Sequence, residues 1–117
     1  MKTTSPRKHR VATLPELALA VRSEVLAGGG SERAATGAEA LIVQIVALLE
    51  DGRPWIGRQE DLARQLDRGV WSLRRYLRLL GELGLIEVTP LGPQGCSIRA
   101  GERLNLWLSD PNWGMTS

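Results

Sequence analysis

The feature that most constrains the fold of this chain is the stretch of residues 68–86, RGVWSLRRYLRLLGELGLI. Three of its leucines recur at intervals of four and three residues, the spacing of one face of a helix; they are Leu73, Leu77 and Leu80. Gly84 follows at a position where many helices end. The pattern therefore predicts a helix over residues 70–82 whose leucine face, with Tyr76 alongside, packs on a core.

The same helix is expected to carry a basic outer face. The first eleven residues of the stretch hold four arginines and no acid, and the first acidic residue is Glu82. With the leucines inward, the turn of about 100° per residue directs four other side chains outward: Trp71, Arg74, Arg75 and Arg78. A charged helix face is often only a solvated face, but the acids that would form ion pairs along this helix are missing. We therefore expect the arginines to contact nucleic acid. Trp71 has an alternative, which is to pack on the preceding helix or over Leu66.

Two helices are predicted in the N-terminal half. Residues 14–27 begin with Pro15 and end before Gly28, a common arrangement of helix starts and stops. A set of apolar residues would share one face of this helix: Leu14, Leu17, Val21, Val25 and Leu26. Residues 28–33, GGGSER, predict a loop, and residues 38–51 are apolar on nearly every side. The second helix is therefore expected to lie buried in the middle of the domain.

The segment before the arginine-rich helix predicts a short extended piece and a third helix. Residues 53–57 contain Pro54, which favours an extended conformation, and residues 58–67 return to helical spacing. The inward candidates here are Ile56, Leu62, Ala63 and Leu66.

The C-terminal part predicts a hairpin. Residues 85–91 alternate as a half-buried strand does, residues 92–95 (GPQG) form a turn signal, and residues 96–100 provide a return strand. Leucines at alternate positions suggest one more short strand or an edge segment: Leu104, Leu106 and Leu108.

The order helix, short strand, helix, turn, helix, hairpin is that of a winged helix-turn-helix. The stretch RQEDLARQLDRGVWSLRRYLRLLGELGLIEV resembles the core of bacterial and phage winged helix-turn-helix domains, and the resemblance covers roughly residues 39–100. Leu62-Ala63 match the first helix of the motif, and Gly84-Leu85-Ile86 match the end of the second. The turn departs from the family pattern, because Asp67, Arg68 and Gly69 replace the usual Gly, apolar residue and polar cap. The expected fold class is mainly α with a small β wing and an extra N-terminal helix.

The resemblance implies binding to double-stranded DNA through the second helix of the motif. A helix fits the major groove, arginine presents a fork to guanine or phosphate, and free backbone N–H groups at a helix start attract an anion. The candidate DNA-binding residues are Arg68, Gly69, Trp71, Ser72, Arg74, Arg75, Arg78 and Arg99. The wing, TPLGPQGCS, carries no Lys or Arg, and only Arg99 lies nearby. A basic N-terminal arm could enter a minor groove instead, or could be an ordinary solvated tail; its cations are Lys2, Arg7, Lys8 and Arg10.

Length and composition set the remaining expectations. The 117 residues suggest a flexible arm (1–13), one domain (14–110) and a loose tail (111–117). Cys96 is the single cysteine, and we see no signal peptide and no membrane span, so we expect a cytoplasmic protein. His9, the single histidine, lies in the arm. We therefore expect no catalytic centre, no metal site and no cofactor.

Two function classes remain. The first is a transcription repressor or regulator, or a plasmid or phage replication accessory, that acts by occupying a DNA site. We expect such a protein to be a homodimer, with the helices at residues 14–27 and 38–51 or the tail in the interface; the sequence does not identify an effector. The second is a winged-helix module that binds another protein, which the uncharged wing favours.

Overall fold

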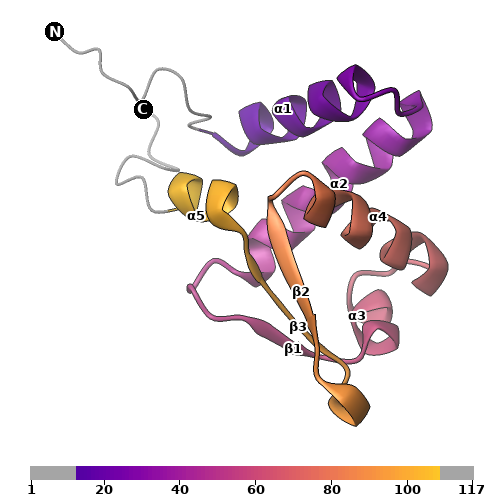
Figure 1. The fold of residues 1–117 in the computed structure, drawn as a ribbon, viewed down its shortest axis with the longest axis vertical. Helices are drawn as coiled ribbons and strands as arrows, with labels where there is room; N and C mark the ends of the chain where they lie inside the picture. The colour runs from indigo at the N-terminus through magenta and orange to yellow at the C-terminus, as the bar shows by residue number, and fades with distance from the viewer. Residues whose placement is uncertain (1–12, 109–117) are drawn as a thin grey trace, which may run out of the picture.

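The structure is a computed structural model, and it describes residues 13–108. Helices predominate, and the strands form one small sheet (Figure 1). In chain order the elements are α1 (Leu14–Ala27), α2 (Glu32–Leu48), β1 (Trp55–Gly57), α3 (Gln59–Gln65), α4 (Val70–Glu82), β2 (Ile86–Pro90), a 3₁₀ turn (Gly92–Gln94), β3 (Cys96–Ala100) and α5 (Glu102–Leu108). The expected class, mainly α with a small amount of β structure, is therefore confirmed.

Helix α1 has the predicted bounds, and its start is fixed by a capping box. The Thr13 hydroxyl accepts a hydrogen bond from the Glu16 backbone N–H at 3.3 Å, and the Thr13 N–H donates to the Glu16 carboxylate at 3.1 Å. Thr13, assigned to the arm by sequence, is thus the cap of the first helix. Of the expected inner face, Leu26 is 37% exposed, whereas Leu17, Val21 and Val25 are buried.

Helix α2 begins and ends earlier than the predicted range 38–51. Its cap is Ser31, whose hydroxyl accepts from the Ala34 N–H at 3.0 Å, so part of the expected loop 28–33 is already helical. The predicted start at residue 38 was wrong because a serine cap followed by alanines outweighs the single Gly37. The expected burial is confirmed along the apolar part of the helix, at Ala38, Leu41, Ile42, Ile45 and Val46.

Helix α4 has the predicted bounds, and the three leucines of its inner face are 0–2% exposed. Tyr76 is buried beside them. Gly84, with φ +77°, follows the helix in the left-handed conformation that favours glycine.

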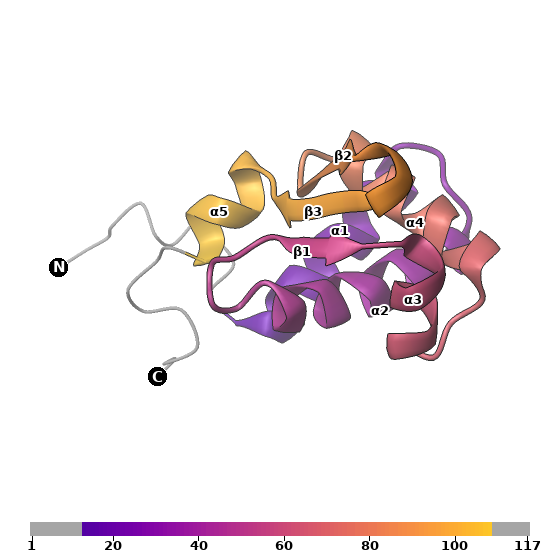
Figure 2. The same cartoon turned by 90° about the horizontal axis from the view of Figure 1, so that it is seen from below.

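The three strands form an antiparallel sheet in the order β1-β3-β2. Ile98 of the central strand lies opposite Trp55 and Val88 and is fully buried. The expected hairpin is confirmed. Its tip lies on the side of α3, whereas α5 lies at the other end of the sheet (Figure 1 and Figure 2).

Two expectations about side chains and elements were wrong. Ile56 was expected inside but is 58% exposed, because successive residues of β1 point to opposite faces and Trp55 takes the inner one. The leucines after residue 100 belong to helix α5, not to a strand: Leu104 is buried and Leu106 is 59% exposed. None of the helices within residues 13–108 is long and apolar enough to cross a membrane.

Candidate nucleic-acid interface

The outer face of α4 has the composition that the sequence predicted. Trp71 is 79% exposed, and Arg74, Arg75 and Arg78 are also exposed. The exposure of Trp71 rules out the alternative in which it packs over Leu66. Ser72 in the first turn is exposed as well. The helix therefore presents three guanidinium groups and an indole to solvent.

The turn between α3 and α4 contains Asp67, Arg68 and Gly69, the residues at which the sequence departs from the pattern that it resembles. Asp67 has φ +56°, the left-handed conformation for which the usual residue is glycine. Gly69 is the cap residue of α4, and no side chain bonds to the helix start there. Its carbonyl accepts from the Leu73 N–H at 2.9 Å. The first backbone N–H groups of α4 thus have no side-chain cap.

Arg68 belongs to the turn rather than to the arginine face of α4. Its Nε donates to the Gln44 side-chain oxygen at 2.6 Å, and the Gln44 amide donates to the Leu66 carbonyl at 3.2 Å. Both contacts are partly buried. The structure therefore does not bring Arg68 together with the arginines of the α4 face, and Arg68 ties the turn to α2 instead. Gln44 was missed by sequence, although it is the one polar residue in the apolar run ALIVQIVALL.

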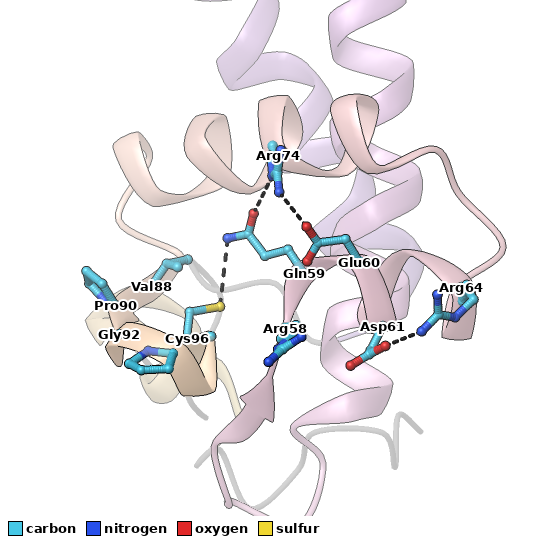
Figure 3. A pocket seen from close by; sticks show the side chains of 12 residues that line it. Arg58, Gln59, Glu60, Asp61, Arg64, Arg74, Val88, Pro90, Gly92 and Cys96 are labelled. Carbon is cyan, nitrogen blue, oxygen red and sulfur yellow. Dashed lines mark hydrogen bonds and ion pairs between the residues drawn. The ribbon is translucent and has the colours of Figure 1, made fainter.

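Arg74 is held by two residues of α3 and contacts Trp71. Its Nε donates to the Gln59 side-chain oxygen at 3.1 Å, and its Nη2 pairs with the Glu60 carboxylate at 3.1 Å (Figure 3). Its Cζ lies 5.8 Å from the centre of the Trp71 ring, within the range of a cation–π contact. Gln59 and Glu60 stand at the start of α3 and were not among the predicted residues. Their only sequence signal is their place in the helix that precedes α4.

Arg75 and Arg78 differ from Arg74. Both are exposed, and neither forms an ion pair or a side-chain hydrogen bond within the part of the chain that the structure describes. The acids on the neighbouring helix reach only one of the three arginines. Two cations on this face are thus free to meet a ligand.

A cleft of about 830 Å³ lies between the start of α3, Arg74 and the β2–β3 hairpin (Figure 3). Its hairpin wall is mainly apolar, and its helical wall carries paired charges, Arg74 with Glu60 and Arg64 with Asp61. Gln59 joins the two walls, because its amide lies 3.7 Å from the sulfur of the buried Cys96. A second hollow of about 670 Å³ continues between α4 and β2 and includes Arg78.

Arg99 is not brought together with the arginines of α4. It lies opposite Glu87 in the register of β3 with β2 and lines hollows near Asn105 and α5. That end of the sheet is opposite the hairpin tip (Figure 1). The four arm cations, Lys2, Arg7, Lys8 and Arg10, and the tail 111–117 lie outside the described residues.

No cluster of three or more His, Cys, Asp or Glu side chains that could hold a metal ion occurs within residues 13–108. No family model matches the chain, and no curated protein or solved structure matches it significantly.

Proposed function

We propose that this chain is a sequence-specific double-stranded DNA-binding protein with a winged helix-turn-helix fold. In this proposal α3, the turn and α4 form the helix-turn-helix, and the β2–β3 hairpin is the wing. The observation that carries it is the outer face of α4, where three exposed arginines stand with no acid on the helix before Glu82. An α-helix fits the major groove, and arginine supplies both phosphate and base contacts there.

The biological role that follows is occupancy of a DNA site, as a transcription regulator or as a replication accessory in a bacterium, phage or plasmid. A homodimer fits such a role, because two half-sites multiply specificity. Two copies of α4 on B-DNA would then lie about 34–36 Å apart, one turn of the duplex.

The test is the salt dependence of duplex binding. Each phosphate contact adds about 0.9 to the slope of log affinity against log salt on B-DNA. Arg75→Ala/Arg78→Ala removes the two arginines of α4 that have no ion-pair partner within residues 13–108. It is expected to lower the slope by almost 2 if both contact phosphate. Fluorescence anisotropy with a labelled duplex at several salt concentrations measures this.

A matched control is Arg53→Ala/Arg99→Ala. It removes the same charge, but both residues line the hollow beside Asn105 near α5. The control is expected to change the slope by much less than the α4 variant does. Normal binding by Arg75→Ala/Arg78→Ala at every salt concentration, with the fold intact, would overturn the proposal that α4 contacts DNA.

The second candidate is a protein-docking module. It is favoured by the exposed indole of Trp71 and by the hairpin tip, Gly92–Gln94, which carries no cation. In that case the salt slope on DNA would be shallow and unaffected by both double variants. Loss of a protein partner on Trp71→Ala would then support docking.

A further inference from the structure

The three arginines of α4 are not equivalent, because only Arg74 is held in place. Gln59 and Glu60 each accept one hydrogen bond from it at 3.1 Å, and Trp71 lies beside its guanidinium. Arg75 and Arg78 have no such partners among the described residues. A side chain with fixed orientation is suited to reading a base, whereas a free one is suited to following a phosphate.

The contacts leave one edge of the Arg74 guanidinium free. Nε–H and one N–H of Nη2 lie on the same side of the planar group, and these donate to Gln59 and Glu60. Three of the five N–H groups remain, including the pair on the terminal edge, one on each Nη. That pair forms a two-pronged donor, which matches two acceptors side by side.

The charge of Glu60 decides between the two acceptor pairs that DNA offers. Guanine presents O6 and N7 in the major groove, and the backbone presents two phosphate oxygens. The Glu60 carboxylate pairs with Arg74 and is itself exposed, so a phosphate at the same guanidinium would face a like charge. An uncharged base edge would face no such repulsion. The Glu60 carboxylate therefore favours guanine over phosphate as the partner of Arg74.

We infer that Arg74 is the residue of α4 that determines sequence specificity by binding guanine, and that Gln59 and Glu60 are positioning residues for it. Arg75 and Arg78 supply phosphate contacts. This inference rests on the proposed function and adds to it which arginine reads a base, which base it reads, and what holds the arginine.

The experiment is selection from a randomised duplex library with the purified full chain, followed by affinity measurements on the selected duplex and on each single-base change. Arg74→Lys keeps the charge but loses the fork, and Arg75→Lys is its matched control on the same exposed face. With Arg74→Lys we expect the preference for one G·C pair to fall about tenfold or more, with an unchanged salt slope. With Arg75→Lys we expect that preference to persist.

The positioning role is tested separately with Glu60→Gln, which removes the charge and keeps an amide of the same size. We expect tighter binding to all duplexes and a weaker guanine preference. Asp61→Asn is the control, because Asp61 pairs with Arg64 rather than with Arg74. An unchanged guanine preference in Glu60→Gln, or a loss as large in Asp61→Asn, would overturn the positioning role.

The outcomes separate this inference from the proposed function. If the wild-type chain binds no duplex even at low salt, the proposed function fails and the inference fails with it. If the chain binds DNA but Arg74→Lys retains the full base preference, or Arg75→Lys or Arg78→Lys loses it instead, the proposed function stands and the inference is wrong. Circular dichroism of each variant confirms that its fold is retained.

Discussion

The ring of Tyr76 packs directly on the backbone of Gly37, so closely that a Cβ at position 37 would lie 2.2 Å from Tyr76 Cζ. Tyr76 is 8% exposed, and its hydroxyl lies 3.4 Å from the Arg33 carbonyl that accepts from it. This contact sets the distance between α2 and α4. The arginine-bearing helix α4 thus packs on the buried helix α2 through a tyrosine ring that lies on a glycine.

The first prediction is that Gly37→Ala lowers the free energy of unfolding by about 1–3 kcal/mol, because the extra methyl group displaces the buried ring. Alanine is otherwise favoured over glycine inside a helix by about 1 kcal/mol, so the clash must exceed that gain. Urea unfolding monitored by circular dichroism measures the change.

Gly81→Ala is the control for helix propensity. Gly81 lies in α4, and the nearest atom to its added Cβ would be the Ile86 carbonyl oxygen at 3.9 Å. This variant is expected to be more stable than the wild type by up to about 1 kcal/mol. In a Tyr76→Leu background, Gly37→Ala should lose most of its penalty; if the penalty stays, the ring is not its cause.

The second prediction concerns Asp67, whose left-handed φ of +56° strains any residue with a Cβ. Asp67→Gly is expected to raise the free energy of unfolding by a few tenths of a kcal/mol, and Asp67→Ala to lower it by about 1 kcal/mol. The residue is exposed, so lost packing does not explain the difference. Equal stability of the Ala and Gly variants would contradict the argument.

The third prediction concerns Gln44, which bonds to both Arg68 and the Leu66 carbonyl. Gln44→Met keeps the length of the side chain but leaves partly buried polar groups without partners. We expect a loss of about 1–2 kcal/mol in the free energy of unfolding. Gln65→Met, at an exposed position of α3, is the control and should change it by no more than about 0.5 kcal/mol. Comparable losses in both variants would speak against a special role for Gln44.

The sequence predicted α1, α4 and the hairpin well because each has local signals that agree. Pro15 and Gly28 bound α1, and the leucine spacing with Gly84 bounds α4. The prediction for α5 failed because alternating leucines over a few residues fit a strand and one and a half helical turns equally well. Leu104 is fully buried, so tertiary packing, and not the local leucine pattern, determines that this segment is helical.

The candidate site was predicted in part for a related reason. Which side chains of α4 face outward follows from helix geometry, and the structure agrees. The contacts of Arg68 and Arg74 come from α2 and α3, 24 and at least 14 residues earlier in the chain. No local pattern indicates which residues these arginines contact, so the contacts of Gln44, Gln59 and Glu60 are visible only in the packed structure.

The fourth prediction is a pH dependence from Glu24 and Arg103. The Arg103 guanidinium binds the Glu24 carboxylate, with Nη1 at 2.7 Å from Oε1, and also donates to the Leu83 carbonyl at 2.8 Å. The pair therefore links α1, the end of α4 and α5. Hydrogen bonding to Arg103, and to a smaller extent its charge, lowers the pKa of Glu24 below its ordinary value of 4.5, although partial burial opposes the shift.

A lowered pKa means that the folded state binds a proton less readily than the unfolded chain does. The contribution of the pair is thus complete above about pH 4.5 and is lost as the pH falls through the pKa of the folded state. Glu24→Gln is expected to lower the free energy of unfolding by about 0.5–1 kcal/mol at pH 7. The value is modest because the side chains of Arg103 and Glu24 are 49% and 35% exposed to solvent. The difference from the wild type should shrink as the pH falls below about 4.5.

Urea unfolding at half-unit steps from pH 3 to pH 7 measures this difference. Glu102→Gln is the control, because Glu102 stands on α5 beside Arg103 in sequence but has no ion pair within residues 13–108. At pH 7 its free energy of unfolding should differ from that of the wild type by no more than about 0.5 kcal/mol. A Glu24→Gln deficit that stays constant down to pH 3 would show that the variant loses packing rather than the ion pair, and the link between α1 and α5 would then not depend on charge.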